Sequence, residues 1–200
     1  NGGLASNYAL ADTAHSVKIN QKALTVSNTS VAGRAYDGTI TLDSSLITGG
    51  TLSGFVTVNG TEETVTISAV SGSINDKNAG SRTATVAYTL ADGTNGGKAD
   101  NYSLADSTHS IVIDKVALTV TGNSAADKTY NGSNAASITV GTLSGFIGSE
   151  TVTASAVGTF TSKDAGVGRT ATAVYILANG NAGGLADNYS LANSIHTAEI

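Results

Sequence analysis

Three histidines, His15, His109 and His196, are the residues of this chain best suited to acid–base chemistry. Nucleophilic catalysis needs a serine or cysteine that is activated by a histidine and an acid. The histidines occupy one register of a long repeat, so they cannot meet in one active site unless the domains fold back on each other. Cysteine is absent, and the sequence contains no GxSxG, HExxH or P-loop motif. We therefore expect a protein that is not an enzyme and has no catalytic residues.

A covalent crosslink is a second kind of chemistry to consider. Lys115, Glu150 and Asn188 follow the chain order that an intramolecular lysine–asparagine isopeptide bond with a buried acid would need. In the preceding repeat, however, Gln21 stands where Lys115 does, and Lys22 is one residue out of register and so on the opposite face of a strand. We interpret Lys115 as a solvated lysine at a domain junction.

Metal binding is weakly indicated. Calcium needs six to eight oxygen ligands, commonly from closely spaced carboxylates. The aspartates considered are scattered and form no DxDxDG loop: Asp76, Asp92, Asp100, Asp106 and Asp114. We interpret them as surface and turn residues, and we expect no metal or cofactor.

Five segments match the acceptor pattern for N-glycosylation. They begin at Asn28, Asn59, Asn101, Asn131 and Asn188. Such matches arise by chance in a chain this rich in Asn, Ser and Thr. We interpret them as turn residues, and the recurring Asn-Tyr pair as the start of a strand whose tyrosine enters the core.

The elements that position these residues are repeated. The stretch NGGLASNYALADTAHSVKINQKALTV from Asn1 returns as NGGKADNYSLADSTHSIVIDKVALTV from Asn95, and its first part returns as AGGLADNYSLANSIHTAEI from Ala182. Self-similarity at a fixed period indicates a tandem array. We predict a C-terminal fragment of a preceding repeat over 1–20, a repeat over 21–114 and another over 115–200. With no methionine, the chain reads as a piece of a longer array.

Strand patterns dominate the two repeats. Residues 64–70 alternate, with Val65, Ile67 and Ala69 on one face, and residues 83–90 alternate in the same way. Asn59-Gly60 predicts a type I′ hairpin turn, since both residues tolerate positive φ. We predict an all-β fold of tandem Ig-like antiparallel β-sandwich repeats in an elongated array. Residues 43–50 could carry one helical turn, so a sheet wrapped on one short helix, as in β-grasp folds, is the alternative.

The apolar phase changes between the repeats. Ile111 and Ile113 occupy odd positions, whereas Leu118 and Val120 occupy even ones. Because successive strand side chains point to opposite faces, the chain should leave one core there and enter another. No Gly, Ser or Pro spacer intervenes, so we predict a stiff joint with the units nearly end to end.

The seven tyrosines fall into three registers: Tyr8, Tyr102 and Tyr189; Tyr36 and Tyr130; Tyr88 and Tyr175. We expect them to serve a core that is built more than once, with Tyr88 and Tyr175 as buried equivalents. Residues 1–20 carry the terminal strand motif without the sheet that would receive it. We expect this segment to be frayed, to lie against the neighbouring unit or to pair with another molecule, since Val17 and Ile19 would otherwise stay exposed.

Composition limits the partners. A net charge of −5 with only ten Lys and Arg leaves no basic stripe, which argues against nucleic acid and anionic membrane. No apolar run reaches the roughly 20 residues of a membrane helix, so we expect no membrane insertion. The missing cysteines exclude disulfides and thiolate metal sites. We expect a monomer whose partners are the neighbouring repeats.

The ordered motifs AYDGT, GTLSGF, DKNAG and KDAG, LADNYSLA and KALTV resemble the YDG and MBG repeat domains of very large bacterial exported proteins. Those proteins often begin with a haemagglutinin-like two-partner secretion domain. The resemblance implies an extracellular or cell-surface location and a role in a long filament or stalk. The second repeat departs from it with Tyr-Asn-Gly at Tyr130.

Our functional prediction is a structural stalk repeat that spaces the adhesive region of a bacterial adhesin from the cell. The alternative is a module that binds a host glycan or protein. Sugar sites usually expose aromatic platforms, but Trp is absent here and the tyrosines are committed to repeated positions.

Overall fold

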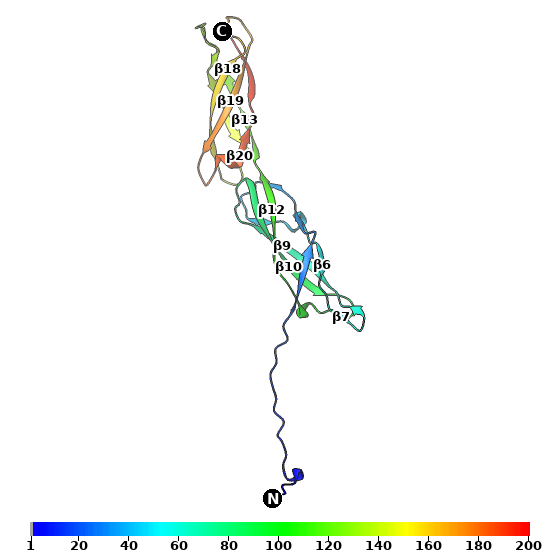
Figure 1. Ribbon diagram of the computed structural model, residues 1–200. Helices are drawn as coiled ribbons and strands as arrows, with labels where there is room; N and C mark the ends of the chain where they lie inside the picture. Colours follow the sequence, from blue (N-terminus) through cyan, green and yellow to red (C-terminus); the bar gives the residue numbers. More distant parts are fainter. Residues whose placement is uncertain (1) are drawn as a thin grey trace.

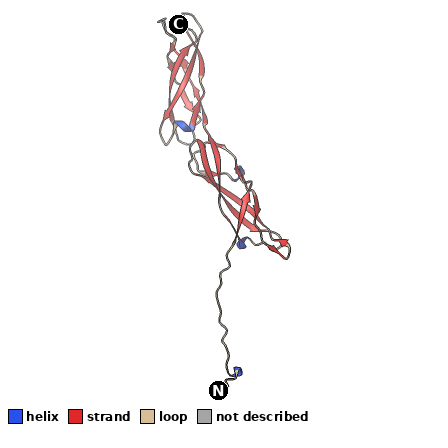
Figure 2. Cartoon of the chain, in the orientation of Figure 1, coloured by secondary structure: helices blue, strands red, loops and turns tan. Residues whose placement is uncertain are grey.

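The computed structural model describes residues 2–200 and has an all-β fold, as predicted. Two sets of strands follow one another along an elongated molecule, and an extended N-terminal segment continues the long axis (Figures 1 and 2). The described helical elements are four three-residue 3-10 turns, η1 (Ala5–Asn7), η2 (Ser44–Leu46), η3 (Ala99–Asn101) and η4 (Ala186–Asn188). The expected helical turn in 43–50 is therefore η2, which is too short for a sheet to wrap around.

The first unit, as we use the term here, spans strands β1 to β12. Its strands are β1 (Lys22–Ser27), β2 (Ser30–Val31), β3 (Arg34–Ala35), β4 (Thr41–Leu42), β5 (Ile47–Thr48), β6 (Thr51–Ser53), β7 (Thr57–Val58), β8 (Thr61–Glu62), β9 (Val65–Ile74), β10 (Gly80–Asp92), β11 (Tyr102–Leu104) and β12 (Ser107–Asp114). They form a three-stranded sheet β11-β1-β6, a five-stranded sheet β3-β12-β10-β9-β4 and the pairs β2-β5 and β7-β8.

The second unit repeats this plan from β13 to β21. Its strands are β13 (Val116–Thr121), β14 (Ser124–Ala125), β15 (Ala135–Ala136), β16 (Ile138–Thr139), β17 (Thr142–Ser144), β18 (Val152–Phe160), β19 (Arg169–Asn179), β20 (Tyr189–Leu191) and β21 (Ser194–Ala198). The sheets are β17-β13-β20 and β15-β18-β19-β21, with the pair β14-β16.

The long ladders are antiparallel, but each unit also contains a short parallel one. β1 runs parallel to β11 from Lys22↔Tyr102 to Leu24↔Leu104, and β13 runs parallel to β20 in the same way. β12 also runs parallel to β3. The sheets are therefore mixed, because the chain returns beside its own first strand only after completing the long hairpin.

Turn and strand predictions hold in most places. Asn59 and Gly60 have φ of 50° and 79° between β7 and β8, which is the predicted type I′ arrangement. In β9, Ala69 was predicted to face inward with Ile67, and this is wrong. Thr89 pairs with Ala69 and Leu90 with Ile67, so a β-bulge leaves Ser68 between them and turns Ala69 outward.

The lower part of the first unit has a small core of its own. Leu24 and Tyr102, from the three-stranded sheet, pack against Val65 of β9, with Phe55 and Leu90 at the edge. This packing places the two sheets face to face, as a sandwich requires.

The N-terminal segment is solvent-exposed throughout residues 2–20. Leu10 is 100% exposed, Val17 85% and Ile19 92%, so their side chains stabilise no core. Tyr8, which shares a register with two core tyrosines, is 78% exposed, and the expectation that all tyrosines serve a core is wrong for it. A tyrosine in this register is buried only where the sheet that receives it is also present.

We predict that removing residues 1–19 leaves the stability of the protein almost unchanged, because exposed side chains contribute little to folding. Calorimetry should give a melting temperature close to that of the full chain. A loss of several degrees would show that the segment belongs to the unit that begins at β1.

Candidate functional site

The site lies where the two units meet, and it starts from the turn after β3. Gly38 has φ of 80°, and the Asp37 carboxylate accepts a hydrogen bond from the Thr39 amide at 2.9 Å. Asp37 also pairs with Arg34, which holds the turn from its other side. The backbone amide of Tyr36 donates to the carbonyl of Asp114, the last residue of β12, at 2.9 Å. These contacts direct the Tyr36 side chain out of the end of the first unit.

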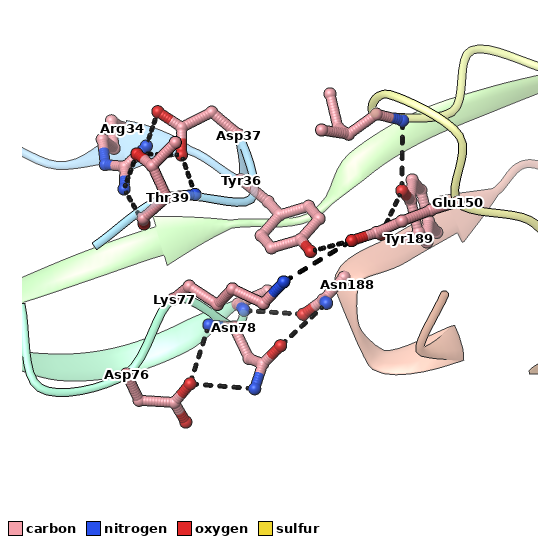
Figure 3. A network of polar contacts seen from close by, with 12 residues as sticks. Arg34, Tyr36, Asp37, Thr39, Asp76, Lys77, Asn78, Glu150, Asn188 and Tyr189 are labelled. Atoms are coloured by element: carbon pink, nitrogen blue, oxygen red, sulfur yellow. Dashed lines mark hydrogen bonds and ion pairs between the residues drawn. The ribbon is translucent and has the colours of Figure 1, made fainter. Parts of the chain in front are cut away.

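Glu150, which precedes β18 in the second unit, receives that side chain (Figure 3). Its carboxylate accepts one hydrogen bond from the Tyr36 hydroxyl and one from the Tyr189 hydroxyl, each at 2.7 Å. Lys77 of the first unit brings its ammonium group to 3.7 Å. Glu150 is only 8% exposed, and a buried carboxylate is costly unless donors surround it. Two of its three partners come from the other unit.

The aromatic rings around Glu150 interlock. Tyr36 and Tyr189 meet edge to face, with centroids 5.9 Å apart and an interplanar angle of 82°. Phe146 also packs edge to face on Tyr189, with centroids 5.7 Å apart, and the Tyr189 hydroxyl accepts from the Ile147 amide at 3.1 Å. Edge-to-face pairs stabilise by about 0.5–1.5 kcal/mol beyond their burial. Tyr189 therefore has three contacts within its own unit, with Phe146, Ile147 and Glu150, in addition to its contact with Tyr36.

Asn188 forms a second polar contact across the junction. Its side-chain NH2 donates to the Asn78 side-chain oxygen at 3.0 Å, and its own oxygen accepts from the Ala79 amide at 2.9 Å. Asn78 is oriented in turn by the Asp76 carboxylate, which accepts from its side chain at 2.8 Å. Asn188 has no exposed surface, so both halves of its amide need the partners that the first unit supplies.

Burial raises the pKa of Tyr36 above its ordinary value, and the hydrogen bond to Glu150 and the charge of that carboxylate raise it further. Burial is also the main cause of the raised pKa of Tyr189, with Glu150 acting in the same direction. Both hydroxyls therefore keep their protons at neutral pH and serve as donors to Glu150. The six residues Tyr36, Lys77, Asn78, Glu150, Asn188 and Tyr189 are called the junction below.

The hydrophobic core runs through the junction without a break. Ile111 and Ile113 at the end of β12, and Leu118 in β13, belong to one cluster of buried side chains that also contains Tyr36 and Tyr189. The prediction that the chain leaves one core and enters another is therefore wrong in this respect. The phase of the apolar alternation does change between β12 and β13, but the apolar side chains on both sides of this change belong to the same cluster.

Parts of this arrangement recur at the two outer ends. Tyr102 donates to Glu63 at 2.9 Å in the first unit, as Tyr189 does to Glu150. At the far end of the second unit, Tyr130 occupies the register of Tyr36 but is 53% exposed, whereas Tyr36 is 1% exposed. The expectation of a core role is thus wrong for Tyr130 as well, and the contrast shows that Tyr36 is buried by its neighbouring unit.

The isopeptide candidates are partly brought together. Glu150 and Asn188 share the junction, but Lys115 is exposed between β12 and β13, and the lysine that reaches Glu150 is Lys77. The interpretation of Lys115 as a solvated lysine is consistent with this. Sequence reasoning missed Lys77, although the repeated Lys-x-Ala-Gly at Lys77 and Lys163 was a signal that could have found it.

His15 lies 3.1 Å from the Thr13 hydroxyl in the exposed N-terminal segment, and the other two histidines each contact their own unit. His109 lies 2.6 Å from the Ser107 hydroxyl, and His196 lies 2.6 Å from the Ser194 hydroxyl. Tyr175, which is 9% exposed, joins the second pair at 2.7 Å from Ser194; its equivalent Tyr88 is only half-buried. Over residues 2–200 neither imidazole is hydrogen-bonded to a carboxylate, so the pairs lack the orienting acid of a catalytic triad.

The remaining candidates have local roles. Asp92 accepts a hydrogen bond from the Ala99 amide at 2.8 Å and forms an ion pair with Lys98. The Asp76 carboxylate accepts a hydrogen bond from the Asn78 amide. In the described part of the chain no three His, Cys, Asp or Glu residues gather as a metal would need. Of the glycosylation candidates, Asn28 and Asn59 have positive φ as turn residues. Asn188 is enclosed in the junction, where no glycan could be attached in the folded state.

Fold and site together define a class: tandem β-units, joined end to end by a buried glutamate that accepts from tyrosines of both units. The chain belongs to the YDG domain family, whose model matches twice, over residues 20–109 and 114–197. No curated protein and no solved structure matches the chain. Among the described residues, no helix is long and apolar enough to cross a membrane.

The Tyr36 hydroxyl can be tested against a matched control. Tyr36→Phe removes one donor from the buried Glu150 and should destabilise the protein by about 1.5–3 kcal/mol, the usual range for a hydrogen bond to a charged group. Tyr130→Phe changes the exposed equivalent and should stay within about 0.5 kcal/mol of wild type. Equal effects in urea unfolding would contradict the role assigned to Tyr36.

The tyrosine pKa shifts predict a loss of stability in alkali. A folded-state pKa raised above the unfolded value of about 10 means that the folded state holds the proton more tightly. The stability that the protonated tyrosines contribute to the folded state is fully present below about pH 10 and is lost as the pH rises above that value. Tyr36→Phe should flatten this dependence, measured as unfolding free energy together with tyrosinate absorbance. An unchanged slope in the variant would exclude Tyr36 as its source.

Proposed function

We propose that this chain is a stiff spacer: stalk repeats of a large bacterial surface or secreted adhesin that hold an adhesive region away from the cell. The observation that carries the proposal is the sharing of Glu150 between tyrosines of two consecutive units. A joint whose polar and apolar contacts are both buried resists bending. In a linear array each unit contacts only its neighbours, so length grows with the number of units.

Several features support this role over catalysis or transport. The described chain is elongated, and its units meet at their ends rather than along their sides (Figure 1). No flexible linker separates the two units, since β12 ends at Asp114 and β13 begins at Val116. The same proposal implies that the chain lies outside the cell as part of an exported protein. It assigns the chain no enzymatic activity.

The shape test compares wild type with a variant that loosens the joint. Glu150→Ala leaves the hydroxyls of Tyr36 and Tyr189 without their buried acceptor, at a cost of about 1–3 kcal/mol for each. Small-angle X-ray scattering should show a rod for wild type and a broader distribution of maximum dimensions for the variant. Glu63→Ala, at the outer end, is the control and should keep the wild-type profile.

The functional test places the chain between an inert surface anchor and a fluorescent tip. The height of the tip above the cell should rise when the wild-type chain is inserted, and should fall for Glu150→Ala. Saturable binding of the isolated chain to a glycan array, lost on substitution of an exposed side chain, would favour the rival role as a binding module. No height difference between inserted and empty anchors would refute the spacer role.

A further inference from the structure

The loop over residues 75–79, between β9 and β10, supplies both partners of the Asn188 side chain. The side-chain oxygen of Asn78 accepts from the Asn188 NH2 at 3.0 Å, and the Ala79 amide donates to the Asn188 oxygen at 2.9 Å. Asn188 has no exposed surface, so bulk water cannot replace these partners. The conformation of this loop therefore decides whether the enclosed amide of Asn188 is satisfied.

Arg82, near the start of β10, holds the loop from within its own unit. Its Nε donates to the carbonyl of Asn78 at 2.9 Å, and its Nη2 donates to the carbonyl of Ala79 at 2.8 Å. The same Nη2 lies 3.4 Å from the Asp76 carboxylate, and only 21% of the Arg82 side chain is exposed. A guanidinium presents five donors in a fixed plane, so it can bind several acceptors of one loop at once, whereas an ammonium group offers a single point of contact.

The hydrogen bond from Arg82 to the Asn78 carbonyl also sets the direction of the Ala79 amide. The two groups belong to one peptide bond, which is trans, and in a trans peptide the C=O and N–H point in opposite directions. With the carbonyl turned toward Arg82, the N–H is turned away from it and toward the Asn188 oxygen. Rotation of this peptide plane would break both hydrogen bonds together.

A second route from Arg82 to Asn188 passes through Asp76 (Figure 3). One carboxylate oxygen of Asp76 accepts from the backbone amide of Asn78 at 3.0 Å and from its side-chain NH2 at 2.8 Å, and the other oxygen faces Arg82. Because Asp76 binds the NH2 half of the Asn78 side chain, the oxygen half is left for Asn188. The ion pair between Arg82 and Asp76 thus orients the acceptor that the second unit needs.

We propose that Arg82 is the positioning residue of the joint between the units. In the described chain its hydrogen bonds all go to the first unit, yet it sets both partners of Asn188 in the second. Lys77 lies in the same loop, so its approach to Glu150 depends on Arg82 as well. The inference rests on the proposed function and deepens it, because it names the side chain that fixes the joint.

The second unit offers a matched control. Arg169 stands where Arg82 does in the repeat, and it donates to the carbonyl of Ala165 in the equivalent loop at 2.7 Å. It begins β19, whereas Asn179 at the other end of that strand binds the turn that leads to Asn188. A change at Arg169 therefore alters the same kind of loop contact away from the joint.

The first test follows hydrogen exchange by NMR in the full chain. Arg82→Lys keeps a positive charge beside Asp76 but cannot bind both loop carbonyls. Exchange of the Ala79 amide and of the Asn188 side-chain NH2 should become about 10-fold faster or more, as the loss of a hydrogen bond to a charged group implies for a local opening. The amides at the centres of β10 and β19 should keep wild-type rates, which separates loss of position from loss of stability.

Two further variants complete this test. Arg169→Lys should leave exchange at Ala79 and Asn188 unchanged. Asp76→Ala removes the side-chain route alone, so it should speed exchange at the Asn188 NH2 and spare the Ala79 amide. Wild-type exchange at Ala79 in Arg82→Lys, or equal acceleration along the whole of β10, overturns the proposal. If Arg82→Lys does not fold, Asp76→Ala decides, and wild-type exchange at the Asn188 NH2 then overturns it.

A second measurement separates this inference from the proposed function. The chain has no cysteine, so spin labels at Ser71→Cys and Ile195→Cys, two exposed sites in different units, report the distance between the units alone. The distribution of that distance should broaden for Arg82→Lys as it does for Glu150→Ala, and it should stay narrow for Arg169→Lys.

The two ideas fail in different ways. Broadening in Glu150→Ala without broadening in Arg82→Lys overturns the role of Arg82 and leaves the stiff joint standing. An unchanged distribution in Glu150→Ala contradicts the stiff joint itself, and exchange at the Ala79 amide then still decides on Arg82.

Discussion

The carboxylate of Glu150 is the group on which the arrangement of the two units depends. This carboxylate is buried, and it accepts hydrogen bonds from Tyr189 in its own unit and from Tyr36 in the neighbouring one. A carboxylate in that position is tolerated only while its donors remain in place. Separating the units would remove a tyrosine and a lysine from Glu150 and would expose the enclosed amide of Asn188. The contacts that attach the two units to each other therefore also fix their relative orientation.

The distribution of apolar side chains supports the same view. The base of the first unit, around Leu24 and Tyr102, forms one cluster, and the far end of the second unit, around Phe160 and Ala171, forms another. The largest cluster lies between them and draws residues from both units. Packing is thus more continuous across the boundary between repeats than it is within either repeat. In a protein with only 5% aromatic residues, several of the large rings, Tyr36, Phe146 and Tyr189, are placed at this boundary.

Sequence reasoning predicted the repeat, the all-β class and the type I′ turn at Asn59-Gly60, because each follows from local pattern or from direct self-comparison. It did not find the junction. Tyr36 and Glu150 are 114 residues apart, and internal repetition tells which positions are equivalent without telling which ones touch. Treating equivalent tyrosines as equally buried failed at Tyr8, which has no receiving sheet among the described residues, and at Tyr130, whose equivalent Tyr36 is buried by the neighbouring unit. The bulge at Ser68 was missed because it changes the phase of β9 without any glycine or proline to mark it.

The parallel ladders have a mechanical consequence. In the first unit the chain enters through β1 and leaves through β12, which follows β11 after two residues, and β1 is paired with β11 over Lys22–Leu24. A pull on the two ends of the molecule drags β1 and β11 past each other along their length. The backbone hydrogen bonds between them are then loaded in shear and must yield together, instead of opening one after another as in a peeled hairpin. The second unit repeats the arrangement with β13 and β20, so tension would pass through one such clamp in every repeat.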